Sequence, residues 1–169
     1  MRIIEDFNAY AKGSVVKGLS TLLFNPCFHS IALYRFSCFL NNIHLSPLAK
    51  VVWYLNRILY NVDLDYRSKI DGGFRLIHGF GVVIGCDVVA GKNLTVYQGV
   101  TLGGNGNRRR VINGVEHTQP YLEENVTIYV DAKIFGPIHI ENDIKIKAGK
   151  IISKESDVPK LVVKESQID

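Results

Sequence analysis

The sequence of 169 residues contains only three cysteines, and no two of them form a CxxC pair or another metal-ligand spacing. Cys27, Cys38 and Cys86 are scattered, which favours a reducing compartment and argues against a zinc site. Each is best interpreted as a small buried hydrophobic residue. The sequence therefore predicts a chain that folds with neither disulfides nor a metal.

Long apolar runs are also lacking. Lys50 and Arg57 interrupt the most apolar stretch, so no segment approaches the roughly 18 uninterrupted apolar residues of a membrane span. Glu5, Asp6 and Lys12 stand where a secretory signal would be apolar, and no nucleic-acid-binding motif is present. We therefore expect a cytoplasmic protein without a nucleic-acid partner.

Acidic residues are scarce at the N-terminal end. Residues 1–60 hold six Lys/Arg and two Asp/Glu, whereas residues 61–169 hold fourteen of each, so the whole net charge of +4 arises in the first part. A basic segment rich in aromatic residues could bind peripherally to the inner face of a membrane. The alternative is that these charges simply face water.

Residues 1–60 are predicted to be α-helical. Their last part carries apolar residues at helical spacing that form one stripe, consisting of Leu48, Val51, Val52, Leu55, Ile58 and Leu59. We expect this helix and the one before it to pack together and against the rest of the chain.

From residue 70 the apolar pattern changes to a period of six. One row consists of Ile70, Leu76, Val82, Val88, Leu94 and Val100, and a row two positions later consists of Ile84, Ala90, Val96 and Leu102. After a break between Gly103 and Tyr121 the rows return as Val126, Ala132, Ile138 and Ile144, and as Ile128, Ile134, Ile140, Ile146 and Ile152. This period fits neither an α-helix nor an ordinary β-sandwich.

A period of six has a simple physical solution, in which each hexad forms one short strand and a corner. Three hexads close a triangular coil of about 18 residues, and stacked coils pair their strands at about 4.7–4.9 Å. We therefore predict a mainly β chain, with a helical segment over residues 1–60 and a parallel β-helix over residues 61–155. A loop is inserted at residues 103–121, and a short tail follows over residues 156–169.

Two motifs add a family resemblance. The segments His78-Gly-Phe-Gly-Val-Val-Ile-Gly and Gly99-Val-Thr-Leu-Gly-Gly resemble the serine O-acetyltransferase family of left-handed β-helix enzymes, and the likeness covers roughly residues 25–155. Within that group the chain looks most similar to the colanic-acid-type polysaccharide O-acetyltransferases. The resemblance implies an acetyl-CoA-dependent O-acetyltransferase without a metal, which assembles as a homotrimer with sites between subunits.

Acetyl transfer to a hydroxyl needs a general base, and His78 is the candidate because an imidazole titrates near neutral pH. Asp63 precedes His78 by the spacing that the family uses for its aspartate, which would orient the imidazole. Asp65 is a rival for that role. His117 lies in the inserted loop and resembles the family's acceptor-holding histidine. Loops of such length in a regular repeat are usually functional.

The same resemblance implies a groove for the pantetheine arm of acetyl-CoA. Gly103 and Gly104 leave room for a thin chain. The residues expected to line the groove are Gly104, Asn105, Val130, Lys145 and Ala148.

The predicted acceptor site departs from the family's pattern. Glu116 stands where the family has an arginine for the substrate carboxylate, and Ile77 stands where it has an aspartate before the catalytic histidine. Arg108, Arg109 and Arg110 could replace that arginine or contact an anionic polysaccharide. We therefore expect a sugar hydroxyl of a bacterial surface polysaccharide as the acceptor. The alternatives are L-serine and a catalytically inactive trimeric scaffold.

Overall fold

The computed structural model describes residues 1–159, so the end of the predicted tail lies outside the described residues. Helices α1 (Arg2–Ala11), α2 (Val15–Phe24), α3 (Pro26–Asn42) and α4 (Ser46–Tyr60) come first. The strands are β1 (Asp63–Leu64), β2 (Lys69–Ile70), β3 (Arg75–Ile77), β4 (Val83–Ile84), β5 (Val89–Ala90), β6 (Thr95–Tyr97), β7 (Thr101–Gly103), β8 (Arg110–Ile112), β9 (Val115–His117), β10 (Tyr121–Leu122), β11 (Thr127–Ile128), β12 (Lys133–Phe135), β13 (His139–Ile140), β14 (Lys145–Ile146) and β15 (Ile151–Ile152). A 3₁₀ turn over Glu155–Asp157 follows.

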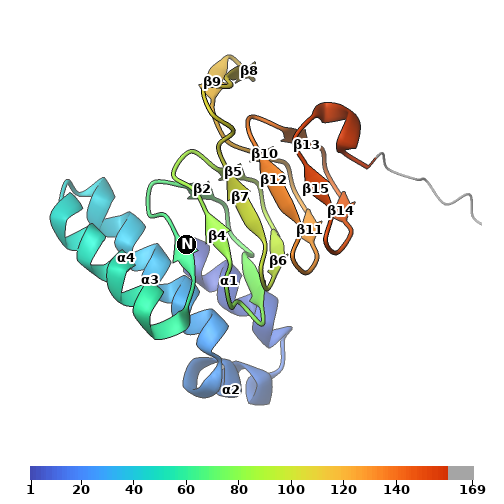
Figure 1. Cartoon of the computed structure of the whole chain (residues 1–169). Coiled ribbons are helices and arrows are strands. Elements are labelled where there is room, and N and C mark those ends of the chain that lie inside the picture. The colour runs from blue at the N-terminus through green and yellow to red at the C-terminus, as the bar shows by residue number, and fades with distance from the viewer. Residues whose placement is uncertain (160–169) are drawn as a thin grey trace, which may run out of the picture.

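Three parallel sheets form the faces of a prism, as Figure 1 shows. Their strand orders are β1-β4-β7-β12-β15, β2-β5-β10-β13 and β3-β6-β11-β14. Each strand pairs with the strand one coil further on, which is the pairing of a β-helix. The predicted mainly β fold, a left-handed β-helix with N-terminal helices, is confirmed.

The core is the interior of this prism. The aliphatic side chain of each strand points inward, and Ile84, Val96, Leu102, Ile128 and Ile134 are at most 1% exposed. The residues directly before several strands, such as Val82, Val88 and Val126, are also buried at the corners. Burial of this apolar ladder stabilises the stack of coils, together with the backbone hydrogen bonds between successive coils.

The first coil is longer than the sequence pattern predicted. Ile84 pairs with Leu102, eighteen residues later, but Leu76 pairs with Val96, twenty residues later. The two extra residues lie between β3 and β4, at the corner that holds His78. In the predicted apolar row, Leu76 is therefore an inward residue of a strand, whereas Val82 is a corner residue. The two apolar rows of the sequence are also two residues apart, so a two-residue insertion leaves the period of six apparently unbroken.

The inserted loop has a structure of its own. Ala90 pairs with Leu122, thirty-two residues later, so this coil is fourteen residues longer than a regular one. Part of the insertion forms an antiparallel hairpin, in which β8 pairs with β9, and Figure 1 shows it standing out from the prism.

The helices cover the first coil. Asp6 of α1 is fully buried and accepts hydrogen bonds from Arg35 Nε (2.8 Å), Arg35 Nη2 (3.1 Å) and the backbone N–H of Phe74 (2.8 Å). Arg35 of α3 also donates to the backbone carbonyls of Ile70 and Asp71. This buried ion pair joins two helices to the β-helix.

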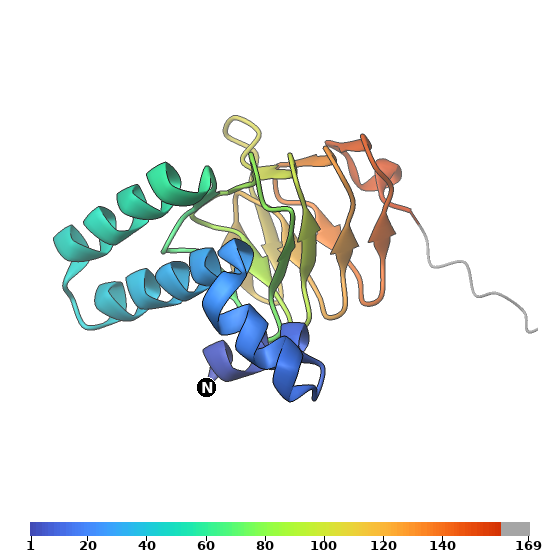
Figure 2. The ribbon, with the colours of Figure 1, turned by 90° about the horizontal axis from the view of Figure 1, so that it is seen from below.

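Helices α3 and α4 form an antiparallel pair that extends beside the prism, and α2 lies below them (Figure 2). The expected packing of α3 and α4 against each other and against the rest of the chain is confirmed, but most of the apolar stripe of α4 faces outward. The buried residues of α4 are Ala49, Val52 and Asn56, whereas Leu55 and Ile58 are exposed. Within residues 1–159, no helix is long and apolar enough to cross a membrane.

Candidate active site

His78 occupies the corner between β3 and β4. Its φ of 58° is in the left-handed region, which is uncommon for residues other than glycine and is entered by histidine, asparagine and aspartate more often than by other side chains. Gly81, which also has a positive φ, donates its backbone N–H to the carbonyl of Asn61 in the helix-to-strand connection (2.8 Å). The two-residue insertion thus makes a strained corner, and such corners are frequent at functional sites.

A pocket of about 520 Å³ opens beside His78. It lies between the start of α3, the end of α4 and the first coil, with Tyr10 of α1 at its wall. Its lining residues are Tyr10, Asn25, Pro26, Cys27, Ser30, Leu59, Tyr60, Val62, Leu76, Ile77, His78, Gly79 and Phe80. Apart from His78, the pocket is lined by apolar groups and neutral polar groups.

Cys27 lies in this pocket, although no sequence pattern predicts a cysteine near His78. Its sulfur is only 3.5 Å from the position that a Cβ would take on Gly79, and it contacts the backbone of His78 and Gly79. Burial raises the pKa of the Cys27 thiol, so the thiol stays protonated at neutral pH. A protonated thiol is a poor nucleophile, which favours His78 over Cys27 as the reactive group.

Two polar side chains of the helices line the pocket. The Tyr10 hydroxyl accepts a hydrogen bond from the backbone N–H of Leu76 (2.8 Å) and donates one to its carbonyl (2.9 Å), two residues before His78. Ser30 Oγ is buried and has no hydrogen-bond partner among the described residues. Sequence reasoning missed both, because their positions depend on how the helices pack against a strand far along the chain.

The carboxylate of Asp63 is engaged elsewhere. It accepts a hydrogen bond from Trp53 Nε1 (2.9 Å) and lies 3.4 Å from Arg57 Nη1, both on α4. Among the described residues it has no hydrogen bond or ion pair with His78, although Val62, the residue before it, lines the pocket. Asp65, the rival for this role, is paired with Arg67 (2.7 Å).

His117 ends β9 at the base of the hairpin and is only 5% exposed. Its Nδ1 lies 4.0 Å from the carboxylate of Asp87 and has no hydrogen-bond partner among the described residues. Asp87 also accepts hydrogen bonds from the backbone N–H and the hydroxyl of Thr118. These contacts hold the hairpin against the corner before β5.

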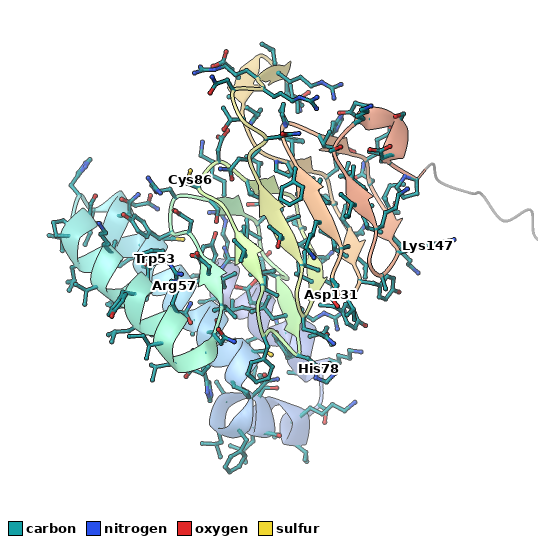
Figure 3. The ribbon with its side chains drawn as sticks, in the orientation of Figure 1. Trp53, Arg57, His78, Cys86, Asp131 and Lys147 are labelled. Atoms are coloured by element: carbon teal, nitrogen blue, oxygen red, sulfur yellow. The ribbon has the colours of Figure 1, made fainter. Side chains whose placement is uncertain are left out.

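The predicted site residues fall on two different edges of the prism. His78, Val130 and Ala148 lie on the edge between the β3 and β4 sheets, where Gly149 donates to the carbonyl of Val130 (2.7 Å). In Figure 3, His78, Asp131 and Lys147 follow this edge. Cys86 lies on another edge, between the sheets that contain β4 and β5. Lys145 is exposed on β14 beside the first edge.

The remaining predicted residues lie on the second edge, where β7 leads into the hairpin: Gly104, Asn105, Arg108, Arg109, Arg110, Glu116 and His117. The three arginines there are engaged within the chain. Arg108 donates to the carbonyl of Ser153 (2.9 Å), Arg109 pairs with Glu116 (2.7 Å) and Arg110 pairs with Glu155. One chain therefore does not bring His78 and His117 together.

Comparisons with known proteins identify the group to which this fold and corner belong. No family model matches the chain. A serine acetyltransferase of Synechococcus elongatus is 34% identical over 142 residues, which is 84% of this chain and 55% of the relative. A serine acetyltransferase of Helicobacter pylori is 33% identical over 138 residues, covering 82% of this chain and 76% of the relative.

Solved structures agree with these relatives. The serine acetyltransferase of Brucella abortus in complex with coenzyme A has a TM-score of 0.78 at 25% identity, over 90% of this chain and 60% of that one. The Neisseria gonorrhoeae enzyme in complex with serine also has a TM-score of 0.78, at 27% identity over 91% of this chain and 61% of that one.

The fold is a β-helix of hexapeptide repeats, similar to these solved structures. The chain belongs to the serine acetyltransferase family. It spans little more than half of the Synechococcus relative, whose further residues have no counterpart in the match. These relatives give no support to the narrower resemblance to polysaccharide O-acetyltransferases of the colanic-acid type.

Proposed function

We propose that this protein is an acetyl-CoA-dependent O-acetyltransferase with His78 as its general base. The observation that carries the proposal is His78 itself, held in a left-handed corner at the wall of a 520 Å³ pocket. Membership of the serine acetyltransferase family and the likeness to the coenzyme A complex of the Brucella enzyme support the choice of acetyl donor.

In the proposed reaction, His78 removes the proton from the acceptor hydroxyl as its oxygen attacks the thioester carbonyl. The C–S bond of the donor then breaks, and the proton passes from His78 to the leaving thiolate. The products are the acetyl ester and the free thiol of coenzyme A. No acyl-enzyme is needed, in keeping with the raised pKa of the Cys27 thiol.

We further propose that the site is completed between chains of a homotrimer. The predicted residues on the two edges cannot meet within one chain, whereas a heterologous contact around a threefold axis places one edge of each chain against the other edge of its neighbour. His78, Val130, Lys145 and Ala148 would come from one chain. Gly104, Asn105 and the hairpin with His117 would come from the next.

Acetyl-CoA would then lie along the groove between the two edges. Gly104 is well suited to this position, because a Cβ there would approach no atom closer than 3.8 Å and the backbone stays open. Lys145 is exposed beside the other edge, where an ammonium could meet a phosphate.

L-Serine is the first candidate for the acceptor, because the relatives are named serine acetyltransferases and the Neisseria structure contains serine. A neutral sugar hydroxyl is the second candidate, and the lining of the pocket favours it. The pocket offers Asn25, Ser30 and the apolar Ile77 in place of charged partners for an amino acid, and Glu116 is already paired with Arg109. Buried polar groups decide such specificity.

The test is the release of free thiol from acetyl-CoA by the purified protein. It is measured with L-serine, with a neutral oligosaccharide and with no acceptor. Release with L-serine at ordinary enzyme rates selects the first candidate, and release only with the oligosaccharide selects the second. His78→Ala should abolish release while leaving the oligomer intact, and Asp63→Asn tests the orienting role. If no acceptor leads to thiol release and calorimetry detects no binding of coenzyme A, the proposal is refuted and the protein is a catalytically inactive scaffold.

A further inference from the structure

Helix α2 has an inverted distribution of apolar residues. The side it buries against α1 carries Gly18 and Thr21, and a Cβ on Gly18 would already lie 3.0 Å from the ring of Phe7. Its large apolar side chains are exposed, up to 87% for Val15 and 78% for Phe24. The exposed set consists of Val15, Val16, Leu19, Leu22, Leu23 and Phe24.

Helix α4 repeats this arrangement with its outward stripe. Its exposed apolar residues are Leu48, Val51, Tyr54, Leu55, Ile58 and Leu59. Isolated apolar residues on a surface are ordinary, but contiguous rows along two helices mark a surface that binds something. We call the outward rows of α2 and α4 together the apolar helix face.

The two rows meet at the mouth of the His78 pocket. His29 connects the helices, because its Nε2 lies 2.8 Å from the carbonyl oxygen of Leu22 and its ring packs edge-on against Tyr60. Leu59 and Phe80, which are 64% and 66% exposed, line the pocket itself. The apolar helix face and the pocket therefore form one continuous surface.

The charges around this face have one sign. The sequence contains no Asp or Glu from residue 7 to residue 62. Lys12, Lys17 and Lys50 are exposed and take part in no ion pair among the described residues, whereas Arg35 is neutralised by Asp6. Exposed large apolar residues flanked by lysines, on helices α2 and α4 that carry no carboxylate of their own, are complementary to anionic lipid headgroups over an acyl layer.

We infer that the apolar helix face docks on the surface of an anionic lipid bilayer, so that the His78 pocket opens at that surface. A second copy of the chain is disfavoured as the occupant, because self-docking would bring the same lysines together without a carboxylate to pair them. The inference concerns docking alone and does not depend on the proposed acetyl transfer.

The test uses the full chain and sucrose-loaded vesicles, made of phosphatidylcholine alone or mixed with phosphatidylglycerol. The protein should sediment with the mixed vesicles, and more weakly with phosphatidylcholine alone. The double variant Leu23→Ser with Phe24→Ser should lower the partition coefficient at least about tenfold. Lys12→Glu with Lys17→Glu should remove the preference for anionic lipid. Val111→Ser, at an equally exposed apolar residue of the hairpin, is the matched control and should bind like the native chain.

Light scattering on the same samples measures the size of the oligomer, and so tests whether a second copy of the chain covers the apolar helix face instead of a bilayer. If the native chain binds neither type of vesicle, the inference is overturned. It is equally overturned if the Leu23→Ser, Phe24→Ser variant forms a smaller oligomer while its vesicle partition matches that of the native chain. In that case the face is an interface between copies.

Discussion

Replacing Asp6 by Asn should lower the free energy of unfolding by about 3–5 kcal/mol, the typical cost of removing one partner of a buried ion pair. Asp6 is 0% exposed, and the Arg35 side chain with which it pairs is only 11% exposed. Asparagine keeps the shape but removes the charge. It also replaces one acceptor oxygen by an NH₂ group that faces donors from Arg35 or Phe74.

The assay is urea unfolding followed by the fluorescence of Trp53, the sole tryptophan, and by far-UV circular dichroism. Glu5→Gln is the matched control, because the neighbouring carboxylate is exposed and should contribute no more than about 0.5 kcal/mol. Asp6→Asn with Arg35→Gln should destabilise less than the sum of the single variants, since the two changes remove one interaction. A loss below about 1 kcal/mol for Asp6→Asn would refute the reasoning, because exposed ion pairs contribute that little.

Three further changes probe the site and its support. Tyr10→Phe leaves the backbone groups of β3 without their hydroxyl partner, so stability should fall by about 1–3 kcal/mol in urea titrations. Turnover measured by thiol release should fall more than the apparent acceptor affinity. Because burial raises the pKa of the Cys27 thiol, its alkylation by iodoacetamide, followed by mass spectrometry, should become appreciable only at a higher pH than for glutathione; an equal rate at pH 7 would contradict this. Gly99→Ala combines a φ of +70° with a Cβ only 1.9 Å from Asp131 Oδ1, so thermal unfolding should show a loss of at least about 1–3 kcal/mol. Gly103→Ala, with no atom within 4 Å, should change stability little.

The β-helix could be predicted because its signal is local and repeated. Ile84, Val96 and Leu102 lie in the interior as their spacing indicated. The same regularity concealed the two-residue insertion at His78, since a shift of two moves a residue from one apolar row to the other. The hairpin was predicted only as a loop. Its two strands are only three residues long, and they pair within an insertion whose end is held to the prism by Asp87, a contact that no local pattern shows.

The helices and the pocket were harder to predict. The spacing of Leu55 and Ile58 indicates one apolar side but does not say what covers it, and the structure places that side outward. The pocket joins Cys27 and Ser30 of α3 to His78 of the first coil. Such contacts depend on how the helices pack against the prism, and no local sequence pattern predicts that packing.

The proposed site between chains is tested most directly by mixing two inactive variants. His78→Ala and His117→Asn chains, carrying different tags, are co-expressed and purified together through both tags. Thiol release from acetyl-CoA is then compared with that of each variant alone. Every mixed trimer retained by both tags has both native histidines at one of its three interfaces, so about a third of the native rate should return. Mixed oligomers as inactive as the single variants would contradict a site shared between neighbouring chains.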